Sequence, residues 1–349
     1  MKWWVILILA AVCAVLLYII FTMAIFYIAN KKMMGTRGED PKNPCYLRFE
    51  DYSSTLVREE FVCGYYGKAI RGYIYKDKRA KDSKAFVVLS HGAFGTHIQY
   101  LLDISLLAED GYEVLAYDQY GVGMSDGDKQ EYLAHGIYVL ENVLHEVEKK
   151  NLNHGLPIYL YGHSWGAYSV AGALRNHPEI AKAVVRSAPI SPYLAGKDVL
   201  KKFSPKTFSL IRPFYGLDYV LLLPRRYRIK ATRGPKKNHK TSVLLLQARD
   251  DTMVPYADSL ARYYELHPQA NVRVFLTEHG KHNTLLAKEG AENYGKLVKE
   301  FKEIDKEPTK ALRDYNEKQF ESTKLSDRKS LYPYEEKTKE EILKFLSGK

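Results

Sequence analysis

The sequence predicts an α/β fold: a mostly parallel, eight-stranded sheet with helices on both faces. Strand-like and helical segments alternate along the middle of the chain, and short loops separate them. Several expected strands, such as 85–90, are continuous apolar runs, which is typical of strands buried on both faces. The hydrophobic share of 46% and the charged share of 27% are ordinary for a folded protein and exclude a disordered or fibrous chain.

The chain begins with an apolar segment that predicts a membrane-spanning helix. From Trp3 to Ala29 no side chain is charged, and a helix of that length, at about 1.5 Å per residue, exceeds the roughly 30 Å of a hydrocarbon layer. A cleaved signal peptide, the alternative, would have a shorter apolar core and a small-residue cleavage site. We therefore expect an uncleaved anchor at 1–30, a polar linker at 31–50 and a single-pass protein of the cell membrane.

The side of the membrane that carries the rest of the chain stays open. One lysine precedes the span, whereas Lys31, Lys32 and Arg37 follow it, which slightly favours a cytoplasmic domain. Cys45 and Cys63 are the only thiols beyond the span. They are compatible with one disulfide in an oxidising compartment or with two reduced cysteines.

The expected body of the protein covers 51–304. It opens with an antiparallel hairpin, in which "TLVREEFVCG" and "KAIRGYIYK" flank the turn "YYGK". Six further strands are expected at "AFVVLS", "YEVLAYD", "LPIYLYG", "AKAVVRSAP", "TSVLLLQA" and "NVRVFLT". The last core helix is expected over 284–304. The charged residues 305–349 are expected to form a helical extension, with helices at 309–321 and 335–346.

A basic segment at 193–240 interrupts the alternation, and we expect it to form a short helical cap over the sheet. Between Lys197 and Lys240 it holds 13 Lys or Arg and only two acids, Asp198 and Asp218, so it accounts for the net charge of +11. Its aromatic and aliphatic residues suit an acyl chain, and its charge suits anionic lipid headgroups or an acidic substrate. Because no zinc, helix-turn-helix or RNA-recognition signature accompanies it, nucleic acid is not an expected partner.

The stretch "YLYGHSWGAYS" places Ser164 between a predicted strand and a helix of small residues. A sharp strand-to-helix turn exposes a serine hydroxyl, and Gly162 and Gly166 let neighbouring backbones approach without Cβ clashes. The helix N-terminus also favours developing negative charge. The G-x-S-x-G pattern is a weak signal alone, but in this context it predicts a nucleophile rather than a merely tight turn.

A serine nucleophile needs a base that is itself held by an acid, and on this framework the acid and then the histidine follow later strands. The loop "RDDTMVP" offers Asp251, with Asp250 as the alternative. The loop "EHGKHNTLL" offers His282 just before the last core helix, with His279 as the alternative.

Two backbone amides are expected to bind the oxyanion that forms when a serine attacks an acyl group. One is the amide of Trp165, next to the nucleophile. The other is the amide of Ala93 in the glycine-rich turn "SHGAFG", with Phe94 as the alternative. His91 and His163 are then expected to be structural residues that pack beneath the site.

The motifs "SHGAFGTHIQY", "YDQYGVGMSDG", "GHSWG", "RDDTMVP" and "GKHN", in this order, resemble those of the α/β-hydrolase superfamily. The likeness is strongest to its monoacylglycerol-lipase-like and serine-aminopeptidase-like branch. This resemblance implies the α/β-hydrolase fold. It also implies that Ser164, Asp251 and His282 form a catalytic triad and that Ala93 and Trp165 form the oxyanion hole.

The resemblance covers roughly 55–304 and departs from the family's pattern at two points. Ala248 stands where a glycine is usual before the acid loop. The cap is short and unusually basic, so the family's substrate cannot be carried over.

These observations predict a membrane-anchored serine hydrolase of carboxylic esters, an esterase or lipase that forms an acyl-enzyme without metal or cofactor. Its expected partners are a small ester or acyl substrate and membrane lipid, which would contact the N-terminal span and the basic cap. A serine aminopeptidase or amidase and an acyl thioesterase are alternatives, because the same groups cleave amides and thioesters. A non-catalytic binding protein that keeps the fold is the alternative from another class.

Overall fold

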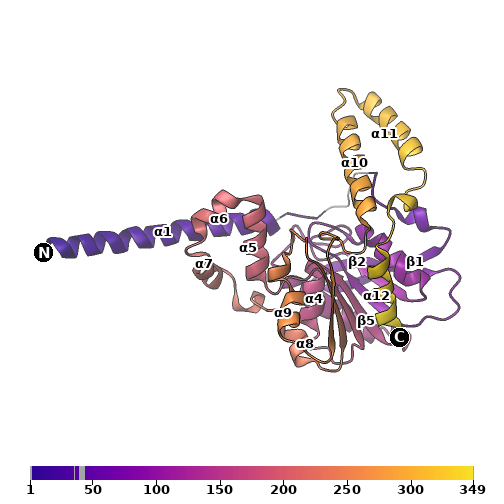
Figure 1. Cartoon of the computed structure of the whole chain (residues 1–349), viewed down its shortest axis with the longest axis horizontal. Coiled ribbons are helices and arrows are strands. Elements are labelled where there is room, and N and C mark those ends of the chain that lie inside the picture. The colour runs from indigo at the N-terminus through magenta and orange to yellow at the C-terminus, as the bar shows by residue number, and fades with distance from the viewer. Residues whose placement is uncertain (1, 35, 39–43, 349) are drawn as a thin grey trace.

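A computed structural model describes residues 2–34, 36–38 and 44–348 of the chain, so the predicted linker at 31–50 lies partly outside the described residues. One long helix, α1 (Trp3–Met34), extends away from an α/β body, and a group of three helices contacts its second half (Figure 1). A helical hairpin projects from another side of the body (Figure 1). No disulfide joins the described cysteines, and Cys63 is a buried free thiol.

The sheet has eight strands in the order β1-β2-β4-β3-β5-β6-β7-β8. The first two pairings, β1 with β2 and β2 with β4, are antiparallel, and the other pairings are parallel. This arrangement confirms the predicted mostly parallel sheet of eight strands. The strands are β1 (Leu56–Tyr65), β2 (Lys68–Asp77), β3 (Phe86–Ser90), β4 (Glu113–Tyr117), β5 (Ile158–His163), β6 (Lys182–Arg186), β7 (Ser242–Ala248) and β8 (Val272–Thr277).

Helices cover both faces of the sheet because the central strands are apolar on both sides. Every residue of β3 and β4 is buried. On one face, Val88 packs in a cluster with α3 (His135–Lys149), α4 (Trp165–Ala173) and α9 (Leu260–Leu266). On the other face, the neighbouring β3 residues pack in a second cluster with α2 (Leu101–Glu109) and α12 (Glu336–Ser347). Because successive side chains of a strand point to opposite faces of the sheet, they pack in two separate cores.

The end of the chain packs differently from the prediction. The expected last core helix is α10 (Lys288–Ile304), but it pairs with α11 (Lys310–Lys324) in the projecting hairpin (Figure 1). There the tilted rings of Phe301 and Phe320 lie 5.9 Å apart. Helix α12 instead buries Ile342 in the sheet's second core. The segment 305–349, expected to form a charged helical extension, thus includes one helix that packs on the body, because the apolar face of α12 covers strands that α10 leaves bare.

The predicted cap is present in its first part. Helices α5 (Pro192–Phe203), α6 (Pro205–Ile211) and α7 (Tyr215–Leu222) contact α1 (Figure 1). The segment then returns to the body, where α8 (Arg233–Lys237) contacts α4 so closely that a Cβ on Gly234 would lie 1.7 Å from the carbonyl oxygen of Ala171. The cap is thus shorter than the predicted 193–240. Short 3₁₀ helices occupy Phe49–Tyr52, His97–Tyr100, Arg225–Tyr227, Tyr256–Asp258 and Lys329–Leu331.

Candidate active site

Ser164 occupies a strained turn between β5 and α4. Its backbone has φ 57° and ψ −115°, a conformation that non-glycine residues rarely adopt. The two flanking glycines make the turn possible. A Cβ on Gly162 would lie 2.6 Å from the backbone of Gly166, and a Cβ on Gly166 would lie 1.8 Å from the carbonyl oxygen of Ser90. The sequence pattern around Ser164 therefore has the strand–turn–helix context of a nucleophile elbow.

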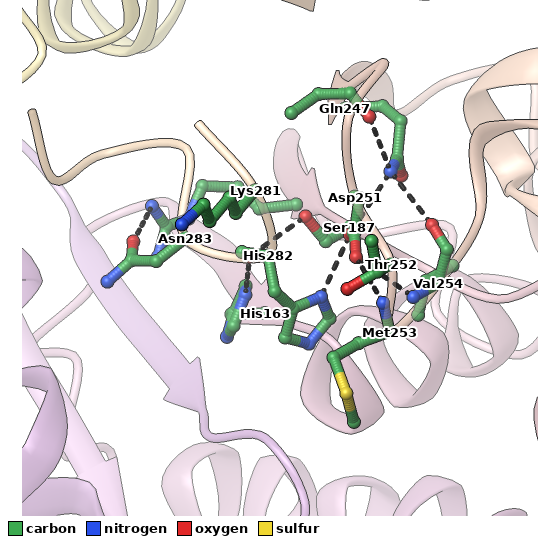
Figure 2. A network of polar contacts seen from close by, with 12 residues as sticks. His163, Ser187, Gln247, Asp251, Thr252, Met253, Val254, Lys281, His282 and Asn283 are labelled. Atoms are coloured by element: carbon green, nitrogen blue, oxygen red, sulfur yellow. Dashed lines mark hydrogen bonds and ion pairs between the residues drawn. The ribbon is translucent and has the colours of Figure 1, made fainter. Parts of the chain in front are cut away.

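Asp251 and His282 meet at the same edge of the sheet, on the loops that follow β7 and β8. His282 Nδ1 lies 2.8 Å from Asp251 Oδ2, and Asp251 is buried (Figure 2). The other carboxylate oxygen accepts the backbone amides of Met253 and Val254 at 2.8 and 3.0 Å (Figure 2). An ionised carboxylate held by these donors fixes the proton of His282 on Nδ1.

The alternative residues lie nearby but do not take this position. Asp250 accepts the backbone amide of Lys281 at 2.8 Å and lies 3.7 Å from the ring of His279. The His279 side chain is exposed. Asp250 thus ties two loops together at the surface, and the buried acid–histidine pair is the one formed by Asp251 and His282.

Ser164 and His282 line the same cavity. Within the described residues no hydrogen bond joins the two side chains, and such contacts are often long before substrate binds. The cavity also borders Ala93, Phe94 and Trp165, the residues expected to supply the oxyanion hole. Four of the five predicted site residues and the Phe94 alternative therefore line one cavity, and the fifth, Asp251, is hydrogen-bonded to His282.

The backbone amides near Ser164 favour Ala93 over Phe94 as an oxyanion donor. The Phe94 amide donates to Gln130 Oε1 at 3.3 Å. The Ala93 amide has no hydrogen-bond acceptor among the described residues, and neither has the amide of Trp165, in the first turn of α4. Both remain available to a negatively charged oxygen.

His163 does more than pack beneath the site, which the sequence reasoning missed. Its Nε2 lies 2.7 Å from the backbone carbonyl of His282 (Figure 2), and its Nδ1 lies 2.7 Å from the hydroxyl of Tyr100. Burial, together with the charges of His282 and Arg186, lowers the pKa of His163 well below its usual range. The neutral ring then donates from Nε2 to the carbonyl and accepts the Tyr100 hydroxyl at Nδ1.

A second donor and a buried ion pair complete the support of the His282 loop. The Ser187 hydroxyl donates to the His282 carbonyl at 3.2 Å (Figure 2). Arg186, at the end of β6, lies 2.6 Å from Asp103 of α2 and donates to the Asn283 side chain at 3.5 Å. The only sequence signal for these groups is their place at strand ends next to the triad loops.

The cavity is mainly apolar and is walled by the cap and by α1. Neither acidic nor basic side chains are among its described lining residues, apart from His282. Asp198 lies 3.4 Å from Lys197, and the Asp218 carboxylate accepts a hydrogen bond from Thr22. The positive charge of the cap therefore lies outside the cavity. Among the described residues, no group of three or more His, Cys, Asp or Glu side chains is placed to hold a metal ion.

The chain resembles known hydrolases and peptidases over part of its length. The family model described as serine aminopeptidase, S33, matches 81–215. A monoglyceride lipase homolog of monkeypox virus is 34% identical over 110 residues, which cover 31% of this chain and 39% of that protein. A proline iminopeptidase of Thermoplasma volcanium is 32% identical over 126 residues, which cover 36% and 42%. The chain thus spans only about two fifths of the length of these curated relatives.

A solved structure shows the same fold over a greater length. An esterase of Pyrococcus furiosus superposes with a TM-score of 0.55 at 21% identity, and the match covers 76% of this chain and 97% of that chain. The sharp β5–α4 turn, the Asp251 loop after β7 and the His282 loop after β8 therefore belong to a fold shared with that esterase.

Proposed function

We propose, from the premise that the chain belongs to the α/β-hydrolase superfamily, that it is a serine hydrolase of carboxylic esters. The observation that carries this proposal is the Asp251–His282 hydrogen bond beside Ser164, which stands at a positive-φ elbow in the same cavity. Scattered serine, histidine and aspartate residues of a binding protein would have no reason to adopt this arrangement.

The geometry assigns each group a step. With the proton on Nδ1 directed to Asp251, His282 Nε2 carries the lone pair that takes the Ser164 proton as the hydroxyl attacks the acyl carbon. The amides of Ala93 and Trp165 stabilise the oxyanion. The protonated imidazole then gives its proton to the leaving alcohol. Water, deprotonated by the same imidazole, hydrolyses the acyl-enzyme and regenerates the serine.

The lining of the cavity supports an ester with an apolar acyl group over a peptide with a free amine. An aminopeptidase needs a negative group to bind the substrate's ammonium ion, and no acidic side chain is among the described lining residues. The two acids of the cap, Asp198 and Asp218, face a lysine and a threonine instead. Aminopeptidase or amidase activity is therefore the weaker candidate, and acyl thioester cleavage uses the same apolar wall.

Helix α1 is proposed to anchor the enzyme in the cell membrane. The segment Trp3–Lys31 is long and apolar enough to cross a bilayer by length and composition, as a signal sequence near the N-terminus also can be. Phe26 is buried against the cap and lines the cavity. A cleaved leader would leave that wall of the cavity open, so these contacts support an uncleaved anchor. Retention in the membrane pellet after carbonate extraction, with the apolar N-terminus intact by mass spectrometry, tests this.

The test of the activity compares the full-length wild type with Ser164→Ala. We expect the wild type to react with a fluorophosphonate probe and to hydrolyse p-nitrophenyl butyrate, and the variant to do neither. Aminoacyl p-nitroanilides should be poor substrates of both. A Ser164→Ala protein with wild-type esterase activity overturns the mechanism, and preferential cleavage of the anilides by the wild type supports the peptidase instead.

A further inference from the structure

Helix α1 has two halves with different surroundings. The described side chains from Trp3 to Leu17 are almost all exposed, whereas Thr22 and Phe26, one helical turn apart, are buried. Such i, i+4 spacing forms one face of a helix. The second half of α1 therefore presents one face to the protein, while the first half is bare, as expected of a helix surrounded by lipid.

The buried face of α1 packs against cap helices α6 and α7. The ring of Phe26 lies 5.4 Å from the ring of Tyr215, and the Tyr18 ring lies 5.6 Å from that of Phe214. Tyr18 also donates to the backbone carbonyl of Leu210 in α6. These contacts bring aromatic rings edge to face or tilted, which is their favoured packing.

A polar contact also holds the buried face of α1 against the cap. The Thr22 hydroxyl donates to a carboxylate oxygen of Asp218 at 3.3 Å, and both side chains are fully buried. Burial raises the pKa of Asp218 above its ordinary value, and the bond from Thr22 opposes that rise. A buried carboxyl group is costly unless it is hydrogen-bonded, so its pairing with α1 marks a specific contact rather than a chance crossing.

This contact brings α1 to the catalytic cavity. Phe26 and Asn30 are among the residues that line the cavity holding Ser164 and His282. Phe26 is 4% exposed, and the next residues on the outer side of the helix, Tyr27 and Ile28, are 58% and 61% exposed. Among the described side chains of α1, those that border the space in front of Ser164 thus lie on its inner face.

The depth of Phe26 and Asn30 in a bilayer follows from helix geometry. About 20 residues span the roughly 30 Å hydrocarbon layer, so a span that begins at Trp3 ends near Thr22. Phe26 and Asn30 then lie at the boundary between lipid tails and headgroups. The cap packed on them exposes apolar side chains, among them Val220 and Leu221, which are 50% and 57% exposed. Exposed apolar groups beside a membrane helix suit contact with lipid.

We propose that α1 is part of the substrate-binding site: its inner face, at Phe26 and Asn30, forms a wall for the acyl chain of an ester lipid that enters the cavity from the bilayer. This inference rests on the proposed function, because it names the substrate class of the same site. Helix α1 is then a specificity element as well as an anchor, and the membrane itself supplies the substrate.

The test uses the full-length protein in lipid nanodiscs and compares p-nitrophenyl acetate with p-nitrophenyl laurate. Phe26→Trp places a larger ring in the wall, and each acyl methylene it excludes should lower kcat/KM for the laurate about fourfold. Two excluded methylenes give a fall of about 15-fold in the laurate-to-acetate ratio of kcat/KM. Phe26→Leu should shift the preferred acyl length upward. Ile28→Trp, the same substitution on the exposed side, should leave both esters as in wild type.

The substrate source has its own measurement. If the laurate enters from the bilayer, its rate of hydrolysis follows its mole fraction in the nanodisc when its bulk concentration is held constant. The rate of acetate hydrolysis follows the bulk concentration of the acetate instead. Thermal unfolding shows whether each variant is folded. The inference is overturned if Phe26→Trp and Ile28→Trp behave alike on the laurate, or if nanodisc dilution has no effect. If Ser164→Ala hydrolyses both esters as well as the wild type does, the proposed function itself is overturned.

Discussion

Replacing Asp251 with asparagine changes the hydrogen-bonding partners that hold the triad. Asp251 Oδ1 accepts the amides of Met253 and Val254, so the single oxygen of an asparagine has to occupy that position. Its NH2 group then replaces Oδ2. There it meets His282 Nδ1 at 2.8 Å and the donating Nε2 of Gln247 at 3.2 Å. Both neighbours need an acceptor at that place, and the asparagine offers a donor.

The proton of the imidazole moves as a result. His282 Nδ1 must accept from the new NH2 group, so its proton lies on Nε2, which then has no lone pair for the Ser164 hydroxyl. The equivalent change in a serine protease lowers kcat about 10⁴-fold, or about 5.5 kcal/mol of transition-state stabilisation. We expect a similar fall in kcat for p-nitrophenyl butyrate, with KM little changed, measured by steady-state kinetics on protein whose thermal unfolding shows that it is folded.

Asp250→Asn is the matched control. Asp250 accepts the Lys281 amide and makes no bond to His282, so its variant should retain near wild-type kcat. The reasoning is refuted if Asp251→Asn keeps more than about a tenth of wild-type kcat, or if Asp250→Asn is the more damaging change.

Three further substitutions test the packing around the site. Gly166→Ala should prevent accumulation of folded protein, because its Cβ would lie 1.8 Å from the last carbonyl of β3; a stable, active variant on expression and thermal unfolding contradicts this. Arg186→Met leaves the buried carboxylate of Asp103 without its cation and should lower the free energy of unfolding by about 3–5 kcal/mol, so an unchanged urea midpoint speaks against it. Burial and then the charge of Asp258 raise the pKa of Asp198 to about 6. Because the folded state then holds this proton more tightly than the unfolded state, this group's contribution to stability is greatest below about pH 4 and is lost as pH rises through 6. Asp198→Asn should remove that decline from the pH profile of Tm, and an identical profile argues for a different group.

The sequence was sufficient for the framework because its signals are local. Continuous apolar runs such as β3 and β4 have few alternatives to a strand buried on both faces. The glycines around Ser164 answer a backbone clash that any sharp strand-to-helix turn creates. The loops with Asp251 and His282 follow strands whose carboxyl ends share one edge of the sheet, so chain order alone brings them near Ser164.

Other features depend on contacts between distant segments, and their residues look ordinary in sequence. The apolar residues of α12 have the spacing of any surface helix, so the sequence could not choose between α10 and α12 as the helix that covers the sheet. The donation from His163 to the His282 carbonyl depends on a loop more than a hundred positions away. A helix that is apolar on all sides carries no polar period, so nothing in the sequence marked Phe26 as the residue that lines the cavity.

The α10–α11 hairpin enters and leaves the body at one point. A β-bridge joins Leu286 to Tyr334, and the Ala287 and Glu335 amides donate to the carbonyls of Pro333 and Leu285. Because the two ends of this insert already touch, the chain on either side needs no rearrangement to accommodate it. It can be shortened, exchanged or lost in evolution without moving the histidine loop before it or the helix after it. This body can therefore acquire new attachments at that point of the chain while its fold stays the same.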